Sequence, residues 1–109
     1  MHNKVEIALH GIAQSGALER YIDLEARRLN GIIDGVRSCQ VVAEALKRQK
    51  LRGAQFAVRL IITLPGTEVV VNREHSDDIY VALHEAFAAA GLQLKDRLRR
   101  RISRDRPGD

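Results

Sequence analysis

The most chemically distinctive residues of this chain are the cations that gather near its C-terminus. Six of them fall between residues 95 and 104: Lys95, Arg97, Arg99, Arg100, Arg101 and Arg104. A guanidinium group is a planar fork of N–H donors that fits phosphate oxygens, and affinity for a nucleic acid backbone sums over many such contacts. A solvated helix end is the alternative, because cations there complement the helix dipole, but that effect is about 0.3–1 kcal/mol and confined to the last turn. The cluster therefore predicts a phosphate-binding surface.

Two smaller groups of cations lie earlier in the chain. One belongs to a polar segment: Lys47, Arg48, Lys50 and Arg52. The other belongs to an expected helix: Arg20, Arg27 and Arg28. The first group also fits an ordinary soluble loop, and the second could simply pair with the nearby acids Glu19, Asp23 and Glu25. With these alternatives open, we predict that both groups join the C-terminal cluster as RNA-binding residues.

The histidines and the single cysteine do not predict catalysis or metal binding. Four potential metal ligands are close in sequence: His75, Asp77, Asp78 and His84. His84 would lie about two turns into a helix that begins near Asp77, however, and the chain has neither HExxH nor CxxC. Cys39 cannot form an internal disulfide, and its place in an alternating apolar pattern is typical of the core. We expect a non-enzymatic protein with no catalytic residue, cofactor, metal or small-molecule substrate.

Composition and charge limit the kinds of protein that this sequence can encode. A hydrophobic fraction of 45% in 109 residues indicates one folded domain, and a net charge of +4 favours an anionic partner. Aromatic residues are only 4% and tryptophan is absent, which argues against a stacking platform for single strands. The sequence shows neither a signal peptide nor a membrane-length apolar run, so we expect a cytoplasmic protein with no membrane partner.

Hydrophobic periodicity predicts the elements that position these side chains. Alternating apolar residues indicate strands at about residues 4–10, 36–46, 56–64 and 68–73. Helical spacing indicates helices at about residues 16–30, capped by Ser15, and 76–104, begun by Ser76. The second helix carries one apolar stripe: Ile79, Leu83, Ala86, Phe87, Ala90, Leu94 and Leu98. Its first part is therefore expected to pack on a core, and its last part to meet negative charge.

The order of these elements predicts an α+β fold, β-α-β-β-β-α. A strand–helix–strand unit followed by an antiparallel meander gives a four-stranded mixed sheet with two helices packed on one face, like a double-stranded-RNA-binding domain. Each helix has a single apolar stripe, so both must cover the same face of the sheet. We expect one domain over residues 1–104, a flexible tail over residues 105–109, and a basic groove between and beyond the helices.

Four stretches of the chain carry a family resemblance. They are VEIALHG at residues 5–11, ALERYIDLEARRLN at 17–30, FAVRLIITLPGTEVVVNRE at 56–74 and DDIYVALHEAF at 77–87. Together they resemble the ribosome hibernation promoting factor family, also called ribosome-associated translation inhibitor or sigma-54 modulation protein, over roughly residues 5–101. The most specific part is the junction where an acid is followed by Ile79 and Tyr80, and then by Ala82 and Leu83, at the start of the last helix.

The resemblance implies a translation inhibitor of stress or stationary phase. Such a protein binds ribosomal RNA of the small ribosomal subunit where messenger and transfer RNA would pass. It implies that basic residues of both helices face this RNA, and the matching positions here are Arg28, Lys95, Arg97, Arg99 and Arg100. The segment from Lys47 to Arg52 matches a variable, often basic stretch. Glu25 and residues 89–92 depart from positions where the family is commonly basic. Longer relatives carry a second domain that pairs ribosomes, which this chain is expected to lack.

Two other functions fit the same pattern of charge. A general double-stranded RNA binder would recognise the shape of any RNA helix, and free duplex RNA would then displace the protein from ribosomes. A small protein-interaction module would use its basic tail to bind an acidic partner protein, and the complex would survive nuclease treatment. These alternatives remain open at the level of the sequence.

Overall fold

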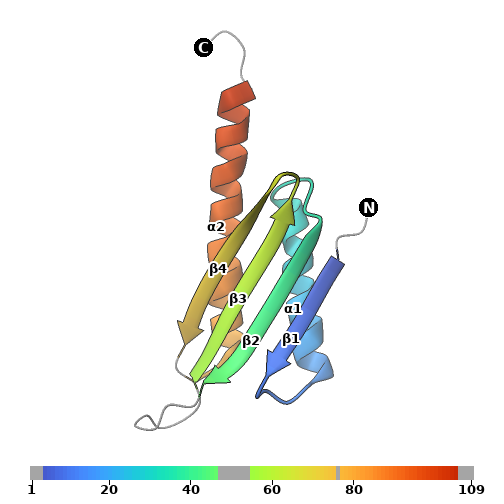
Figure 1. Ribbon diagram of the computed structural model, residues 1–109, viewed down its shortest axis with the longest axis vertical. Coiled ribbons are helices and arrows are strands. Elements are labelled where there is room, and N and C mark those ends of the chain that lie inside the picture. Colours follow the sequence, from blue (N-terminus) through green and yellow to red (C-terminus); the bar gives the residue numbers. More distant parts are fainter. Residues whose placement is uncertain (1–3, 47–54, 76, 106–109) are drawn as a thin grey trace.

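The computed structural model describes residues 4–46, 55–75 and 77–105, and its elements follow the order β-α-β-β-β-α (Figure 1). The elements are β1 (Lys4–His10), α1 (Gly16–Arg28), a 3-10 turn η1 (Leu29–Gly31), β2 (Ser38–Leu46), β3 (Gln55–Leu64), β4 (Thr67–His75) and α2 (Ile79–Asp105). The predicted α+β fold is confirmed.

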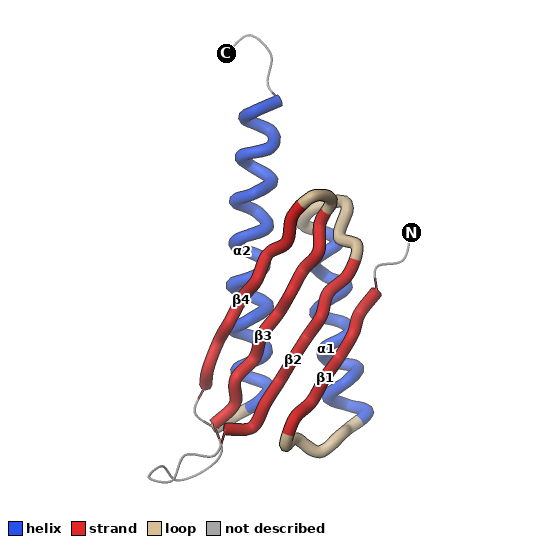
Figure 2. Tube along the Cα trace, in the orientation of Figure 1, coloured by secondary structure: helices blue, strands red, loops and turns tan. Residues whose placement is uncertain are grey.

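The four strands form one mixed sheet in the order β1-β2-β3-β4. β1 pairs with β2 in parallel, with Val5 beside Cys39, and the other two pairings are antiparallel. Both helices lie on the same face of the sheet and run in the same direction (Figures 1 and 2). The helical layer therefore covers one side of the sheet, as the single apolar stripe of each helix requires.

Helix α1 begins and ends where local hydrogen bonding dictates. The predicted cap is confirmed, because the Ser15 hydroxyl accepts a hydrogen bond from the Leu18 N–H at 3.3 Å. The helix ends at Arg28, two residues before the predicted limit, because the chain tightens into η1. Regular pairing of β2 starts at Ser38 and not at residue 36, although the Arg37 N–H already donates to the Thr63 carbonyl at 2.8 Å.

Helix α2 begins at Ile79, later than predicted. Its first N–H groups are satisfied by Asp78, whose carboxylate accepts from the Tyr80 N–H at 2.8 Å and whose carbonyl accepts from the Ala82 N–H at 3.0 Å. Ser76, the predicted start, lies outside the described residues. The helix continues to Asp105, and residues 106–109 of the predicted tail also lie outside them.

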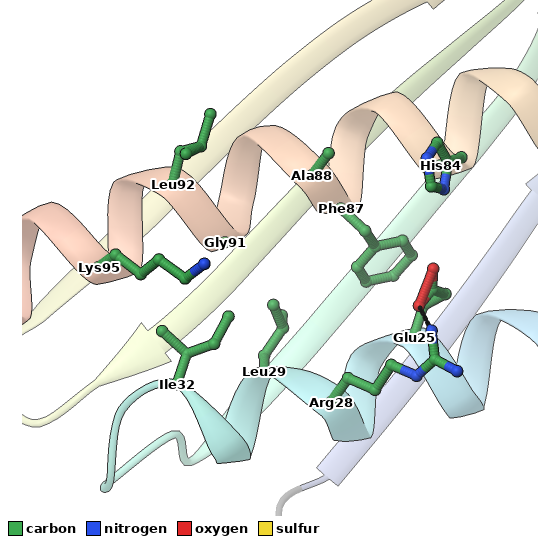
Figure 3. Close-up of a pocket in the computed structure, with 10 residues that line it drawn as sticks. All are labelled: Glu25, Arg28, Leu29, Ile32, His84, Phe87, Ala88, Gly91, Leu92 and Lys95. Atoms are coloured by element: carbon green, nitrogen blue, oxygen red, sulfur yellow. Dashed lines mark hydrogen bonds and ion pairs between the residues drawn. The ribbon is translucent and has the colours of Figure 1, made fainter.

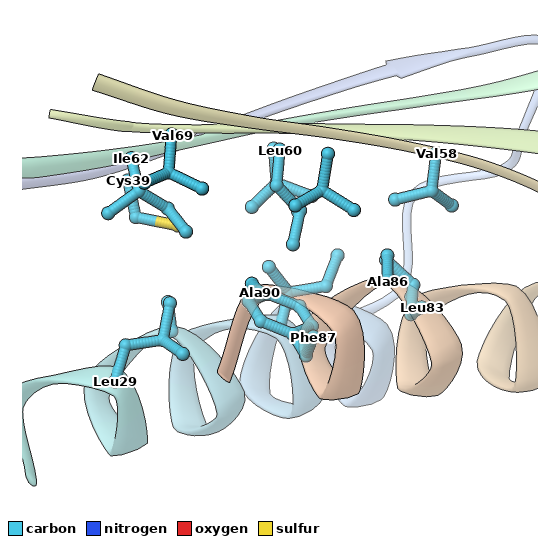
Figure 4. Packing of buried hydrophobic residues seen from close by; sticks show 14 of the residues in the cluster. Leu29, Cys39, Val58, Leu60, Ile62, Val69, Leu83, Ala86, Phe87 and Ala90 are labelled. Atoms are coloured by element: carbon cyan, nitrogen blue, oxygen red, sulfur yellow. The ribbon is translucent and has the colours of Figure 1, made fainter. Parts of the chain in front are cut away.

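The hydrophobic core lies between the sheet and the two helices (Figure 4). Alternate residues of β2, β3 and β4 point into it, and Leu60, Leu83 and Leu94 are fully buried there. The predicted stripe of α2 is confirmed from Leu83 to Leu94, while Ile79 and Leu98 are only half-buried. Helix α2 is thus anchored most firmly up to Leu94, and its packing on the core ends at the half-buried Leu98.

Cys39 lies fully buried in this core and provides a pH-dependent test of it. Burial raises the pKa of its thiol from 9.0 to about 11. The unfolded chain releases this proton first, so we expect the free energy of unfolding to fall by about 2–3 kcal/mol as the pH rises from about 9 to about 11. Denaturant unfolding of Cys39→Ala should lack this component of the decline. Equal slopes for the variant and the parent would contradict burial of the thiol.

Candidate nucleic-acid interface

The C-terminal part of α2 extends past the end of the sheet (Figure 1). Lys95, Arg97 and the consecutive residues Arg99, Arg100 and Arg101 are all exposed, as is Ile102 at 54%. Arg104 belongs to the same helix. The terminal cluster predicted from the sequence therefore begins beside α1 and β4, at Lys95 and Arg97, and its consecutive arginines lie on a helical projection that is open to a large partner.

The cations of this projection surround the helix and do not form a single stripe. Lys95 faces α1, whereas the Arg97 guanidinium donates to the Thr67 hydroxyl at 3.4 Å, at the start of β4. Consecutive residues of an α-helix are about 100° apart, so Arg99, Arg100 and Arg101 point in different directions. Such an arrangement suits insertion between phosphates on several sides better than binding to one flat surface.

Two arginines of α1 form the ion pairs that the sequence left as an alternative. Arg27 contacts Asp23 at 2.8 Å, and Arg28 contacts Glu25 at 3.2 Å. Their guanidinium groups are more than half exposed, and exposed ion pairs contribute only about 0–1 kcal/mol. The pairs therefore do not prevent either arginine from binding phosphate. Arg20 is exposed on the same helix.

A groove of about 410 Å³ separates the two helices (Figure 3). Its walls are formed by Glu25, Arg28, Leu29, Ile32, His84, Phe87, Ala88, Gly91, Leu92 and Lys95. The groove brings together Arg28 and Lys95, which are 67 positions apart in sequence. The groove lies where the sequence predicts one between the helices, and Arg28 and Lys95 give it cations, but most of its lining is apolar.

Glycine and tyrosine residues determine how the helices approach each other. Gly91 is buried, and a Cβ at this position would lie 3.3 Å from Ile32 Cδ1, so a larger residue would press against the chain that follows α1. Near the other end of the helices, the Tyr21 and Tyr80 rings meet edge to face with centroids 5.2 Å apart. Tyr80 thus contributes to the contact between the two helices.

Several residues considered in the sequence have no part in this arrangement. Lys47, Arg48, Lys50 and Arg52 lie outside the described residues. Within residues 4–46, 55–75 and 77–105, no three histidine, cysteine, aspartate or glutamate side chains are grouped so that they could bind a metal ion. In the same part of the chain, no helix is long and apolar enough to cross a membrane.

The sequence predicted a groove between the helices but not its mostly apolar lining. Glu25 was considered as an ion-pair partner and as a departure from the family pattern, and Phe87 as a member of the core stripe, but neither was placed in the groove. Two features indicate a contact surface. One is Gly91, a glycine inside a strongly patterned helix, and the other is its neighbour Leu92, an apolar residue outside the stripe that is 68% exposed in the structure. Neither feature identifies the opposing helix.

The fold of this chain matches that of known proteins. The family model for "Sigma 54 modulation protein / S30EA ribosomal protein" matches residues 5–102. The N-terminal domain of Protein Y from Thermus thermophilus aligns with a TM-score of 0.71 at 24% identity, covering 87% of this chain and 98% of that chain. A ribosomal subunit interface protein from Coxiella burnetii aligns with a TM-score of 0.71 at 20% identity, covering 86% and 96%. A comparison with curated protein sequences gives no significant match.

Proposed function

Because this chain belongs to the sigma 54 modulation protein / S30EA ribosomal protein family, we propose that it binds the small ribosomal subunit through ribosomal RNA. Bound there, it blocks the path of messenger and transfer RNA and inhibits translation during stress, in the cytoplasm and without catalysis. One of its structural relatives is described as a ribosomal subunit interface protein. All three groups of cations predicted from the sequence are candidates for contacts with this RNA.

The observation that best supports this proposal is the cationic projection of α2. Arg99, Arg100 and Arg101 follow Leu98, the last described residue of the helix that packs on the core, so they can enter a narrow, phosphate-lined space without disturbing that core. RNA helices expose phosphates and 2′-hydroxyl groups but hide most base edges, so binding of this kind depends on shape and charge. Counterion release then makes the affinity strongly dependent on salt.

Cosedimentation with purified ribosomes at two salt concentrations tests the proposal. We expect the protein to pellet with the small subunit at about 50 mM salt and to lose at least about 100-fold in affinity at about 200 mM salt, because several phosphate contacts are screened together. Three outcomes would contradict it. Failure to pellet at either salt concentration rules out ribosome binding, displacement by free duplex RNA indicates a general RNA binder, and a complex that survives nuclease treatment indicates a protein partner.

A further inference from the structure

We propose that the groove between α1 and α2 binds one unpaired base of the partner RNA, with a preference for guanine. This inference rests on the proposed function, because it assumes that the helical face meets RNA. It goes further in assigning base recognition to a protein whose cations alone would recognise only phosphate.

The groove offers a base three kinds of contact. Leu29 and Phe87 give it apolar walls, and His84 provides an exposed ring at its edge on which a base can stack (Figure 3). Arg28 and Lys95 line different ends of the groove, where they can contact phosphates of the RNA strand that carries the base (Figure 3). The volume of about 410 Å³ lies within the usual range for small-molecule sites, about 300–1,000 Å³, which matches the size of a single base.

Glu25 gives the groove its selectivity. Its side chain is only 11% exposed, and it lines the groove while Oε2 contacts Arg28 at 3.2 Å. A carboxylate only accepts hydrogen bonds and has about four acceptor positions, so this single contact leaves most of its capacity for a ligand. The ligand must therefore supply N–H donors.

Guanine is the base whose donors best match a carboxylate. Its Watson–Crick edge presents N1–H and the N2 amino group side by side, which can donate to both carboxylate oxygens. Adenine and cytosine offer one amino group next to an acceptor nitrogen, and uracil offers one N–H between two carbonyl oxygens that a carboxylate repels. Because base pairing occupies this edge in a duplex, only an unpaired nucleotide can use the groove.

A protein partner fits the groove less well. An acidic peptide would complement Arg28 and Lys95 but would bring its carboxylates close to Glu25, a like-charge contact in a partly desolvated position. A nucleotide satisfies Glu25 and the two cations with different groups, because its base carries the hydrogen-bond donors and its phosphate carries the negative charge. Charge complementarity therefore favours RNA as the occupant.

Short RNA pentamers test the inference in the absence of ribosomes. At low salt, we expect the 15N-HSQC signals of Phe87, Ala88 and Leu92 to shift on adding UUGUU, and this pentamer to bind at least about tenfold more tightly than UUUUU, the discrimination given by one bidentate contact. Glu25→Gln should abolish this preference, because an amide presents one donor and one acceptor. Asp23→Asn is the matched control on the same helix and should leave the preference unchanged.

The possible outcomes separate this inference from the proposed function. Three outcomes would overturn the inference of guanine binding. The two pentamers could bind with equal affinity, or Glu25→Gln could keep the preference for UUGUU. The groove signals could also respond to RNA-free ribosomal proteins and not to RNA. Asp23→Asn, which lies outside the groove, should cosediment with ribosomes at low salt like the parent. Loss of ribosome binding by the parent protein would instead reject the proposed function, whatever the pentamers show.

Discussion

We expect a triple variant of the projection to bind ribosomes at least about 100-fold more weakly than the parent. This variant combines Arg99→Glu, Arg100→Glu and Arg101→Glu. Hydrogen bonds between charged groups contribute about 1.5–3 kcal/mol each, and glutamates at these positions would also repel the phosphates. The remaining affinity should depend less steeply on salt, because fewer counterions are released on binding. Cosedimentation across a salt series measures both effects.

The fold should survive this change. The three side chains are exposed and lie beyond the buried stripe, and the interaction lost within the helix is the surface pair between Arg100 and Asp96 at 2.8 Å. A matched control reverses Lys4, Arg59 and Arg73, three exposed cations of the strands. We expect both triple variants to keep the circular dichroism spectrum of the parent and the control to keep its ribosome affinity. An equal loss in both would mean that net charge, and not the projection of α2, governs binding.

The strands and the core could be predicted because burial imposes a period on the sequence. Apolar and polar residues alternate in residues 56–64, which leaves one face of that strand apolar. The stripe from Leu83 to Leu94 does the same for helix α2, and the structure buries both faces. The start of β2 was less predictable. Val36 is buried like a strand residue, but the chain joins the sheet there through the Arg37 N–H before regular pairing with β1 and β3 begins.

The lining of the groove could not be predicted, although a groove between the helices was, because the lining depends on how two helices that are far apart in sequence approach each other. A glycine inside a helix is expected to cost about 1 kcal/mol relative to alanine, and the sequence alone shows no compensating benefit at Gly91. In the structure, the absent side chain is what allows Ile32 to lie against the helix. The acid Glu25 likewise gains a defined setting only when Arg28 and the wall of α2 are seen together.

Helix α2 therefore combines two roles that can be separated by mutation. Residues up to Leu98 hold it on the sheet, and Arg99, Arg100 and Arg101 beyond this point carry exposed charge. A helical projection without tertiary contacts gains little stability from propensity alone, so its persistence depends on the packed part that precedes it. A mutation that weakens the packed part should therefore act on stability, whereas one in the projection should act on binding.

Leu94→Ala is expected to lower the free energy of unfolding by about 2–5 kcal/mol, the cost of removing a large side chain from a packed core. Leu94 is 0% exposed, whereas Leu92, two residues earlier on the same helix, is 68% exposed. Leu92→Ala should therefore change stability by less than about 0.5 kcal/mol and serves as the matched control. Urea unfolding followed by circular dichroism measures both. If Leu94→Ala were as stable as the parent, the packed part of α2 would have to end before residue 94. The projection would then begin earlier, and Lys95 could no longer be held at its end of the groove.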